Sequence, residues 1–367
     1  GGTRIHRILL EHGEAAMLAR HPATIAGDAD VEVDAAQLRR RRPDLTALAA
    51  FYDRQGIGTA LRTQADQLAA RFEEEAERRP EALPLFQAAA GGGKADWHAV
   101  AEAVEAAGGP RLRPEAVVPV SGGSISGAFR VASDAGPVFV KRNEAVRAPL
   151  FAAELAGLRA LAQADAVRVP RPLCAGAVGD TAFLVLEWID MVRGGRGAQR
   201  RLGAALAAMH RVRSDRFGWH ADNFIGATPQ ANDWAADWPR FFAERRLAPQ
   251  LAMARDGGHG GRLLRDGERL LSRLDMLFEG HEPAPSLLHG DLWAGNCASD
   301  TAGNPVLYDP AVHYGDRECD LAMSELFGGF DAAFYAAYEA AWPLPPGRER
   351  RRDLYQLYHV LNHLHLF

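Results

Sequence analysis

The chain alternates between helix-like and strand-like patterns of hydrophobic positions, and the pattern changes twice along its length. From residue 1 to about 95, apolar positions such as Leu61, Ala65 and Leu68 recur at helical spacing among many charged residues. This spacing predicts three or four helices, followed by a linker at AAAGGGKAD, residues 88–96. Residues 1–95 are therefore expected to form a separate helical segment.

From Asp96 onward the pattern predicts a short helix and then several strands. Asp96 can cap a helix over 97–107 that ends at a pair of glycines. Beyond it, short β-rich runs alternate with turn residues, and one helix interrupts them at 151–163. The strand-like runs are AVVPV (116–120), AFRVAS, VFVKR (138–142), VPRPLCAG and TAFLVLEWI (181–189).

After Asp190 the pattern becomes mostly helical, apart from one polar loop near residue 290. The predicted order is strands, one helix, more strands and then helices. This order predicts two unlike lobes rather than a doubly wound sheet. We therefore expect an α+β fold with a small antiparallel β lobe and a larger helical lobe, after the extra N-terminal helical segment. The three parts are expected at residues 1–95, 96–190 and 191–367.

Composition and charge mostly exclude classes of protein. The 367 residues carry a formal net charge of -5, which does not favour electrostatic binding of nucleic acid over a broad surface. No run of about 18 apolar residues occurs, so neither a membrane span nor an apolar signal core is expected. Three cysteines without paired spacing argue against a disulfide framework and a zinc site, and they fit a reducing cytoplasm.

The polar loop is LLHGDLWAGN, residues 287–296, which places His289, Asp291 and Asn296 at fixed spacing. In phosphoryl transfer an aspartate accepts the proton of the attacking hydroxyl, and an asparagine five residues later reaches a metal ion on the nucleotide phosphates. Taken alone, the spacing also fits a helix-capping aspartate followed by an incidental asparagine. The segment LYDPA that follows supplies a further carboxylate, Asp309, where a second metal ligand is needed.

Upstream features complete a kinase-like set. In the glycine-rich hairpin SGGSISG, residues 121–127, backbone amides can approach phosphates, although a plain β-turn has the same composition. Lys141 ends a strand and Glu154 lies on the next helix, as in a phosphate-orienting pair, although a surface ion pair has the same spacing. All five features occur in the order of protein-kinase-like proteins, and together they indicate that the polar loop is catalytic.

Longer segments resemble the fructosamine kinases, also called ketosamine 3-kinases, which are relatives of the aminoglycoside phosphotransferases. The resemblance covers about residues 96–367 and is carried by RFGWHADNFIGATPQ, FFAERRLAPQL, LLHGDLWAGN and LYDPAVHYGDRECDLAMSELFGGF. It implies a protein-kinase-like fold and a kinase that uses ATP and Mg²⁺ to phosphorylate the 3-hydroxyl of ribulosamine or fructosamine adducts, free or on protein lysines. The phosphorylated adduct is unstable, so the implied role is deglycation, a form of protein repair.

The resemblance also implies roles for individual residues. Asp291 is expected to be the catalytic base, and Asn296 and Asp309 are expected to be Mg²⁺ ligands. His289 is expected to brace the loop, and Asp320 to cap or brace the same region at the start of an apolar helix. ATP is expected to contact Gly122, Gly123, Ser124, Ser126, Lys141, Glu154, Glu187, Trp188 and Ile189. The sugar is expected to contact Trp219, Asp222, Asn223, Trp293 and Tyr314.

Departures from the family and alternative functions complete the sequence-based expectations. Many relatives carry a cysteine where this chain has Ser124, so a redox switch through that thiol is not expected. Residues 1–95 have no counterpart in the usual family layout; a docking element, a homo-oligomer contact and a fragment of a larger upstream domain are the alternatives for them. The alternative functions are a kinase of the aminoglycoside or choline type, which an acidic acceptor site would favour, and a non-catalytic nucleotide-binding scaffold. The presence of Lys141 and Asp291 argues against a scaffold.

Overall fold

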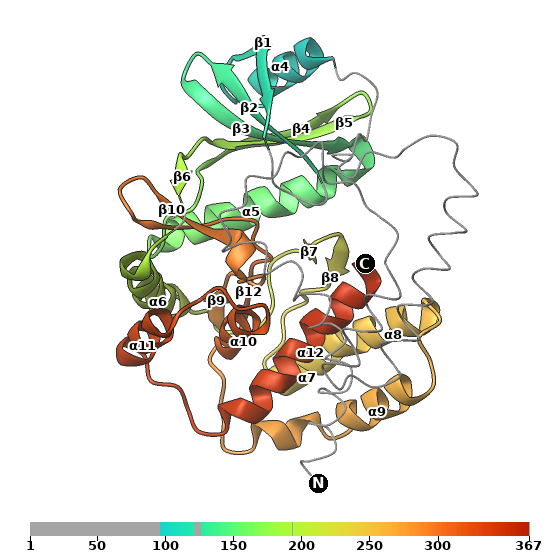
Figure 1. Ribbon diagram of the computed structural model, residues 1–367. Coiled ribbons are helices and arrows are strands. Elements are labelled where there is room, and N and C mark those ends of the chain that lie inside the picture. Colours follow the sequence, from blue (N-terminus) through green and yellow to red (C-terminus); the bar gives the residue numbers. More distant parts are fainter. Residues whose placement is uncertain (1–95, 121–125, 193, 367) are drawn as a thin grey trace, which may run out of the picture. The chain divides into compact units, whose positions relative to one another are not determined.

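The computed structural model describes residues 96–120, 126–192 and 194–366, which all belong to one unit of the chain, residues 88–367. Within them the two unlike lobes predicted from the sequence are present (Figure 1). The predicted N-terminal helices and linker lie outside the described residues, as do Gly122, Gly123 and Ser124.

The sheet of the first lobe has five antiparallel strands in the order β1-β2-β3-β5-β4 (Figure 1). Its strands are β1 (Leu112–Pro119), β2 (Gly127–Ser133), β3 (Gly136–Glu144), β4 (Pro172–Val178) and β5 (Thr181–Glu187). The hairpin between β4 and β5 turns at Gly179-Asp180, where Gly179 has a φ of 52°. A two-residue hairpin turn needs this left-handed conformation, which glycine adopts at no steric cost.

Two helices pack on this sheet. The helix α4 (Trp97–Ala106) begins at Asp96, whose carboxylate accepts hydrogen bonds from two amides of the first turn, so the predicted cap is confirmed. Its buried face, which includes Val100 and Val104, closes a small core with the strands. The helix α5 (Ala148–Ala164) runs along the sheet on the side of the second lobe (Figure 1). It begins three residues before the predicted start, because a 3₁₀ turn (Ala145–Arg147) leads directly into it.

The second lobe is mostly helical, with short strand pairs between its helices. The helices α6 and α11 approach closely because Gly203 has no side chain: a Cβ there would lie 2.1 Å from the carbonyl oxygen of Phe334. The helices are α6 (Arg196–His210), α7 (Trp238–Phe242), a π-helical turn (Ala243–Leu247), α8 (Ala248–Asp256), α9 (Arg262–Leu271), α10 (Glu318–Leu326), α11 (Ala332–Ala341) and α12 (Arg348–Leu366), with 3₁₀ turns at Leu274–Phe278 and Ala294–Asn296. The strands are β6 (Met191–Val192), β7 (Asn223–Ile225), β8 (Thr228–Gln230), β9 (Ser286–Leu288), β10 (Cys297–Asp300), β11 (Pro305–Leu307) and β12 (His313–Gly315).

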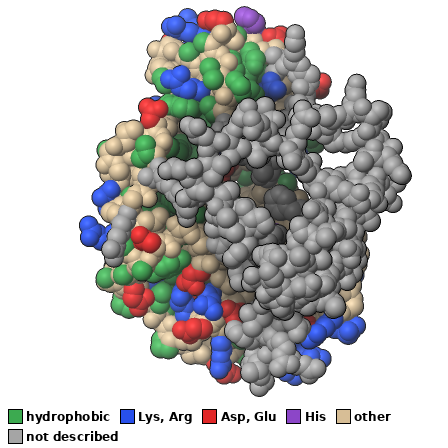
Figure 2. All heavy atoms as spheres, in the orientation of Figure 1, with side chains coloured by type: hydrophobic (Ala, Val, Ile, Leu, Met, Phe, Trp, Pro, Cys, Tyr) green, Lys and Arg blue, Asp and Glu red, His purple; other side chains and the backbone are tan. Residues whose placement is uncertain are grey.

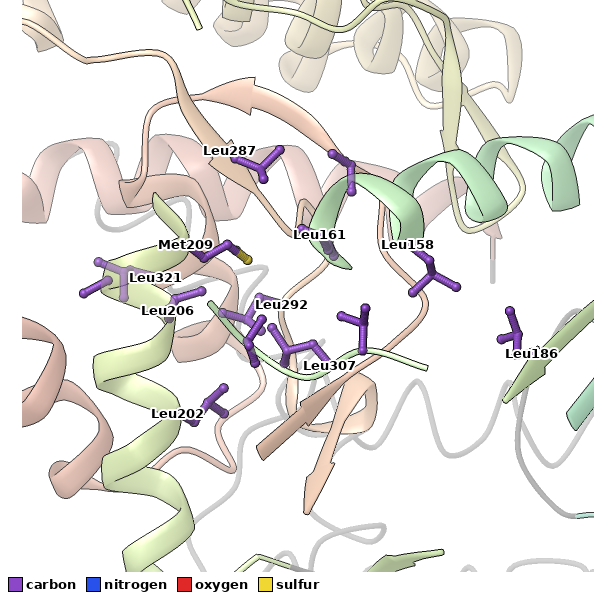
Figure 3. Packing of buried hydrophobic residues seen from close by; sticks show 14 of the residues in the cluster. Leu158, Leu161, Leu186, Leu202, Leu206, Met209, Leu287, Leu292, Leu307 and Leu321 are labelled. Carbon is purple, nitrogen blue, oxygen red and sulfur yellow. The ribbon is translucent and has the colours of Figure 1, made fainter. Parts of the chain in front are cut away.

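One apolar cluster joins the lobes. It brings side chains of α5 and β5 together with side chains of α6, β9, β11 and α10 (Figure 3). Leu292, which follows the predicted catalytic aspartate in the chain, is fully buried in this cluster. Burying a leucine side chain contributes about 2 kcal/mol, so the polar loop is anchored by its own apolar residue.

The described surface is mixed in charge. In Figure 2 the blue and red side chains are interspersed on the part of the face that grey atoms do not cover. No helix among the described residues is long and apolar enough to cross a membrane.

Candidate active site

A buried lysine lies between two carboxylates that come from different parts of the fold. Lys141 Nζ on β3 donates to Glu154 Oε1 and Oε2 on α5, at 2.8 and 2.9 Å, and to Asp309 Oδ1 at 2.6 Å. The side chains of Lys141 and Glu154 are 13% and 15% exposed, so these bonds are far better shielded than a surface ion pair. The structure thus brings together three residues that span 168 positions of sequence.

Electrostatics keeps this lysine charged. Burial lowers the pKa of Lys141, but the charges of Asp309 and Glu154 outweigh burial, and the pKa lies above its ordinary value. For Glu154 burial raises the pKa, and the nearby Asp309 adds to this effect, while Lys141 opposes it. The positive charge of Lys141 thus balances Asp309 as well as Glu154. A lysine that is held among anionic groups in this way is suited to orient phosphate oxygens.

The polar loop is held from behind by His289, as predicted. His289 is fully buried, and its Nε2 lies 3.0 Å from the carbonyl oxygen of Tyr308. Its Nδ1 accepts a hydrogen bond from the amide of Asp291 at 3.3 Å, so the proton of the neutral ring is on Nε2. Burial lowers the pKa of His289, which keeps the ring neutral. A neutral ring with both nitrogens engaged braces the loop and has no free proton for chemistry.

Asp320 braces the same loop, and this prediction is also confirmed. From the first turn of α10 its carboxylate accepts the amides of His289 and Gly290, at 2.7 and 2.8 Å. His210 on α6 adds a third contact, from Nε2 to Asp320 Oδ2 at 3.1 Å. Burial alone raises the pKa of Asp320, but the hydrogen bond and charge of His210 outweigh it, so the pKa lies below its ordinary value and the group is charged.

Gly290 permits this tight turn. Its φ is 83°, and a Cβ at this position would lie 2.1 Å from the carbonyl oxygen of Ala311. The two backbones can approach because glycine has no side chain, and the amide of Ala311 also donates to the carbonyl of His289 at 2.8 Å. The loop is therefore tied directly to the segment that follows Asp309.

The side chain of Asn296 is oriented toward Asp291. Its Nδ2 donates to the carboxylate Oδ2 of Asp291 at 2.9 Å and to the backbone oxygen of Asp291 at 3.0 Å. This leaves the amide oxygen of Asn296 without a partner among the described residues. Asp309 likewise bonds Lys141 through Oδ1 and has a second carboxylate oxygen to offer. Two hard oxygen ligands from neighbouring residues are a donor set that suits Mg²⁺.

Asp309 has an unusual backbone. Its φ is 56°, in the left-handed region that residues with a side chain seldom adopt. Such a conformation costs about 1–3 kcal/mol and tends to persist at functional sites. It directs the carboxylate toward Lys141 while the next residue but one, Ala311, stays bonded to the catalytic loop.

The carboxyl group of Asp291 is poised to take a proton near neutral pH. Burial raises its pKa to about 7, and the charges of Asp309 and Asp320 add to this effect, while the hydrogen bond from Asn296 opposes it. A general base works best when its pKa lies near the pH of operation. The geometry and the electrostatics of this residue therefore agree with the predicted role.

The predicted ATP contacts lie on the first lobe or at its junction with the second. Glu187 ends β5, where it is paired with Val138 of β3, and its amide donates to Arg171 O at 2.9 Å. Ile189, two residues further on, is buried. The ring of Trp188 lies over the sheet, near Phe139. Ser126 belongs to the glycine-rich hairpin, and its Oγ accepts a hydrogen bond from Asn143 at 3.0 Å.

An arginine that the sequence analysis did not single out joins the lobes at this junction. Arg168 donates to Glu187 Oε1 at 3.0 Å and to Asp300 Oδ2, on β10 of the second lobe, at 2.5 Å. The hydrogen bonds to Asn304 and the contact with Arg168 hold the pKa of Asp300 below its ordinary value. No local pattern marks these residues, because only the fold brings them together.

The aromatic residues predicted to contact the sugar fall into two groups. The rings of Trp219 and Tyr314 lie 5.5 Å apart, and Trp234 stacks on Tyr314 at 6.2 Å. Trp293 is instead part of the polar loop and 39% exposed, and the centroid of its ring lies 6.2 Å from that of Phe327. Two aromatic surfaces are thus present, one beside the loop and one at β12.

The two polar residues of the predicted sugar site are engaged in the structure of the β7–β8 hairpin. Asn223 is buried, donates to Val312 O at 2.7 Å, and accepts from Gln230 and Asn232 at 2.8 Å each. Asp222 is exposed and accepts the amide of Asn232 at 2.8 Å. The amide group of Asn223 therefore holds the β7–β8 hairpin against Val312, which directly precedes β12. Tyr314 of the aromatic pair with Trp219 lies on β12.

A cluster of His281, Asp316 and Glu318 in the second lobe has the composition of a metal site. Its hydrogen bonds point to a structural ion network instead. Glu318 makes two bonds to the buried guanidinium of Arg351, at 2.8 and 2.9 Å, and Asp316 accepts from His281 and from the hydroxyl of Tyr355. A cation at Glu318 would have to compete with a paired, buried arginine.

Comparison with known proteins identifies the family. A family model described as fructosamine kinase matches residues 96–367, the span over which the resemblance was expected. This chain belongs to the fructosamine kinase family. Among its relatives is a protein from Synechocystis named as a probable ketoamine kinase. It is 44% identical over 274 residues, which cover 74% of this chain and 92% of that protein.

Two further proteins of the same group are similar to this chain. The chloroplastic protein-ribulosamine 3-kinase of Arabidopsis thaliana is 43% identical over 251 residues, 68% of this chain and 76% of that protein. A crystal structure from Thermobifida fusca, assigned as a fructosamine-3-kinase, is 35% identical with a TM-score of 0.65 and covers 73% of this chain and 92% of that one. These names do not favour the aminoglycoside-type or scaffold alternatives.

The predicted relation to aminoglycoside phosphotransferases holds for the fold. One such enzyme, crystallised with ADP and hygromycin B, is 16% identical with a TM-score of 0.51, and the match covers 72% of this chain and 92% of that one. The protein-kinase-like fold predicted from the order of motifs is therefore confirmed.

Proposed function

We propose that this chain is an ATP-dependent ketosamine 3-kinase whose catalytic base is Asp291. The proposal rests on two hydrogen-bonded pairs, Lys141–Asp309 and Asn296–Asp291, that lie next to each other. Lys141 Nζ bonds Asp309 at 2.6 Å, and Asn296 Nδ2 bonds Asp291 at 2.9 Å, while Asn296 also approaches the backbone oxygen of Asp309 at 3.4 Å. Phosphate-orienting, metal-ligating and proton-accepting groups thus form one connected set.

Each residue has one task in this reaction. Asp291 accepts the proton of the sugar 3-hydroxyl as the hydroxyl oxygen attacks the γ-phosphorus of ATP, and ADP leaves with the electrons of the broken P–O bond. Lys141 binds the α- and β-phosphates and is held in place by Glu154. Asn296 and Asp309 would hold Mg²⁺, which neutralises charge on the phosphates when bound. The adenine would lie against the backbone of Glu187, Trp188 and Ile189.

The acceptor is proposed to be a ribulosamine or fructosamine, free or on a protein lysine. Support comes from the relatives named ketoamine kinase and protein-ribulosamine 3-kinase, at 44% and 43% identity. The exposed ring of Trp293 beside Asp291 and the pair of Trp219 and Tyr314 offer apolar surfaces for a sugar ring face. We propose that 3-phosphorylation destabilises the adduct, so that the sugar leaves and the unmodified amine of the lysine is restored.

The proposal is tested by supplying both sugars. The purified full chain is incubated with Mg-ATP and either ribulosyl-lysine or fructosyl-lysine, and ADP release and the mass of each adduct are followed. A phosphoryl gain on either adduct is expected, and the ratio of the two kcat/KM values names the preferred sugar. ATP binding without a phosphoryl gain on either adduct would contradict the ketosamine assignment and leave the fold in place.

Replacing Lys141 by methionine is expected to raise the KM for ATP more than it lowers kcat. Methionine keeps an unbranched side chain only one atom shorter but removes the cation that faces Glu154 and Asp309. A charge-assisted contact to phosphate contributes about 1.5–3 kcal/mol, which corresponds to roughly a ten- to hundredfold change. Initial rates over a range of ATP concentrations measure the effect. An unchanged KM for ATP would contradict the phosphate-orienting role.

A further inference from the structure

A small internal cavity lies beneath the catalytic loop. It has a volume of about 10 Å³, and its lining includes Gly290 of the loop, Arg246 of the π-helical turn, His313 of β12 and His359 of α12. This is about the smallest space that can hold one water molecule. Because Gly290 lies between His289 and Asp291, an occupant of the cavity contacts the backbone of the catalytic loop.

Two buried polar atoms of the lining residues lack a hydrogen bond within the described residues. They are Arg246 Nε, which can only donate, and His359 Nδ1. The two residues are 2% and 4% exposed, so bulk solvent does not supply the missing partner. Buried polar groups without a partner are rare in folded proteins, and an internal water molecule is the usual explanation.

A third residue of the cavity has an acceptor to offer. His313 Nδ1 lies 3.1 Å from Ala311 O and donates to it, which leaves Nε2 as an acceptor. Burial lowers the pKa of His313 and of His359 to about 3, so both rings are neutral at physiological pH. Among the residues that line the cavity, Arg246 Nε is a donor and His313 Nε2 is an acceptor, and His359 Nδ1 is an acceptor in the tautomer that carries its proton on Nε2. A water molecule can accept one hydrogen bond and donate two, so it can bond one donor and two acceptors at once.

Arg246 connects this cavity to the β7–β8 hairpin. Its Nη1 donates to Ala231 O and its Nη2 to Asn232 Oδ1, both at 2.6 Å, and Asn232 in turn bonds Asn223. Within the described residues no carboxylate pairs with this buried guanidinium. The residue lies in the π-helical turn Ala243–Leu247 between α7 and α8, and such widened turns are frequent at functional sites.

We propose that one water molecule occupies this cavity, accepts a hydrogen bond from Arg246, donates to His359 and His313, and together with Arg246 positions the catalytic loop. The water site stands on the cavity and its lining atoms alone. The effect on catalysis rests on the proposed function of Asp291. Arg246 and His359 are positioning residues, because neither of them touches the reacting atoms.

A high-resolution crystal structure of the wild-type chain tests the site itself. A single peak within hydrogen-bond distance of Arg246 Nε, His359 Nδ1 and His313 Nε2 is expected. The absence of a peak would overturn the proposal. Crystals soaked in bromide provide a second arm, because an unpaired buried cation can also attract a halide. An anomalous signal at the site would overturn water in favour of an anion.

A matched pair of variants tests the effect on catalysis. His359→Leu removes the acceptor at similar volume, whereas His359→Asn keeps an oxygen near the place of Nδ1. His359→Leu is expected to lose the peak and to lower kcat for the ketosamine about ten- to hundredfold, with an unchanged KM for ATP, because small misplacement of a catalytic group costs rate steeply. His359→Asn is expected to keep both the peak and kcat.

The outcomes of the two tests separate the two claims. A His359→Leu variant that lacks the peak but keeps kcat would overturn the coupling to the loop. Equal losses of kcat in both variants would also overturn it, since Asn restores the acceptor. If wild-type protein phosphorylates no ketosamine, the proposed function fails, and the crystallographic peak still decides whether the water site exists.

Discussion

Replacing Asp291 by asparagine is expected to lower kcat about 10²- to 10⁴-fold while ATP still binds. A positioned general base contributes this much to proton transfer, and an amide cannot accept the proton at neutral pH. The side chains of the two residues have nearly the same shape, and the amide oxygen can still accept the hydrogen bond from Asn296. Loss of rate in this variant therefore reports the lost base rather than a displaced loop.

The measurement compares single-turnover rates with a ribulosamine or fructosamine acceptor and, separately, the Kd for ATP by calorimetry. Asp266→Asn is a suitable control, because Asp266 lies on α9 and, among the described residues, its ion pairs are with the surface arginines Arg262 and Arg269. The control is expected to keep wild-type values of both quantities. Full activity in Asp291→Asn would show that another group takes the proton, and the assignment of the base would be wrong.

The first lobe could be predicted from the sequence because its signals are local. Short apolar, β-rich runs between turn residues predicted β3 and β5, and the capping side chain of Asp96 predicted the start of α4. The Lys141–Glu154 pair followed from spacing along one strand and one helix, and its bond lengths of 2.8 and 2.9 Å confirm the contact. The local pattern and the final structure agree here because most backbone hydrogen bonds of each element are made within the helix itself or with a paired strand.

The part of the site that sequence could not predict depends on long-range contacts between buried polar groups. The family resemblance implies that Asn223 contacts the sugar, and the structure adds that its amide group is buried and bonded to Val312, Gln230 and Asn232. No local pattern singles out Arg168 or Arg246. Arg168 joins the two lobes, and Arg246 is 2% exposed. A polar residue in a motif does not reveal whether it faces the ligand or supports the residue that does.

The catalytic loop shows why this distinction matters. Leu292 anchors the loop in the core, His289 ties it to Tyr308, and Asp320 holds its backbone from α10. Asp291 is the one acidic side chain of LLHGDLWAGN, and the fully buried side chains of His289 and Leu292, on either side of it in the chain, hold the loop in place. Positioning of this kind lowers the barrier because the reacting groups need no reorganisation.

Replacing Asp320 by alanine is expected to lower both the free energy of unfolding and kcat. The change leaves the amides of His289 and Gly290 and the Nε2 of His210 without their acceptor in a buried place. Loss of a buried charged partner costs about 3–5 kcal/mol. Because the folded-state pKa of Asp320 lies below 3.8, its contribution to stability is fully present at pH 7 and is lost only as the pH falls through that folded value.

Asp331→Ala is a matched control for this variant. Asp331 also accepts two backbone amides, those of Ala333 and Phe334, but it does so at the start of α11. Its loss is expected to cost about 1 kcal/mol, the usual value of a helix cap, without a change in kcat. Urea denaturation at pH 7 and initial rates measure the two quantities for each variant. If kcat of Asp320→Ala matched that of Asp331→Ala at a temperature where both are folded, Asp320 would serve stability alone, and the loop would owe its geometry to Gly290 and Leu292.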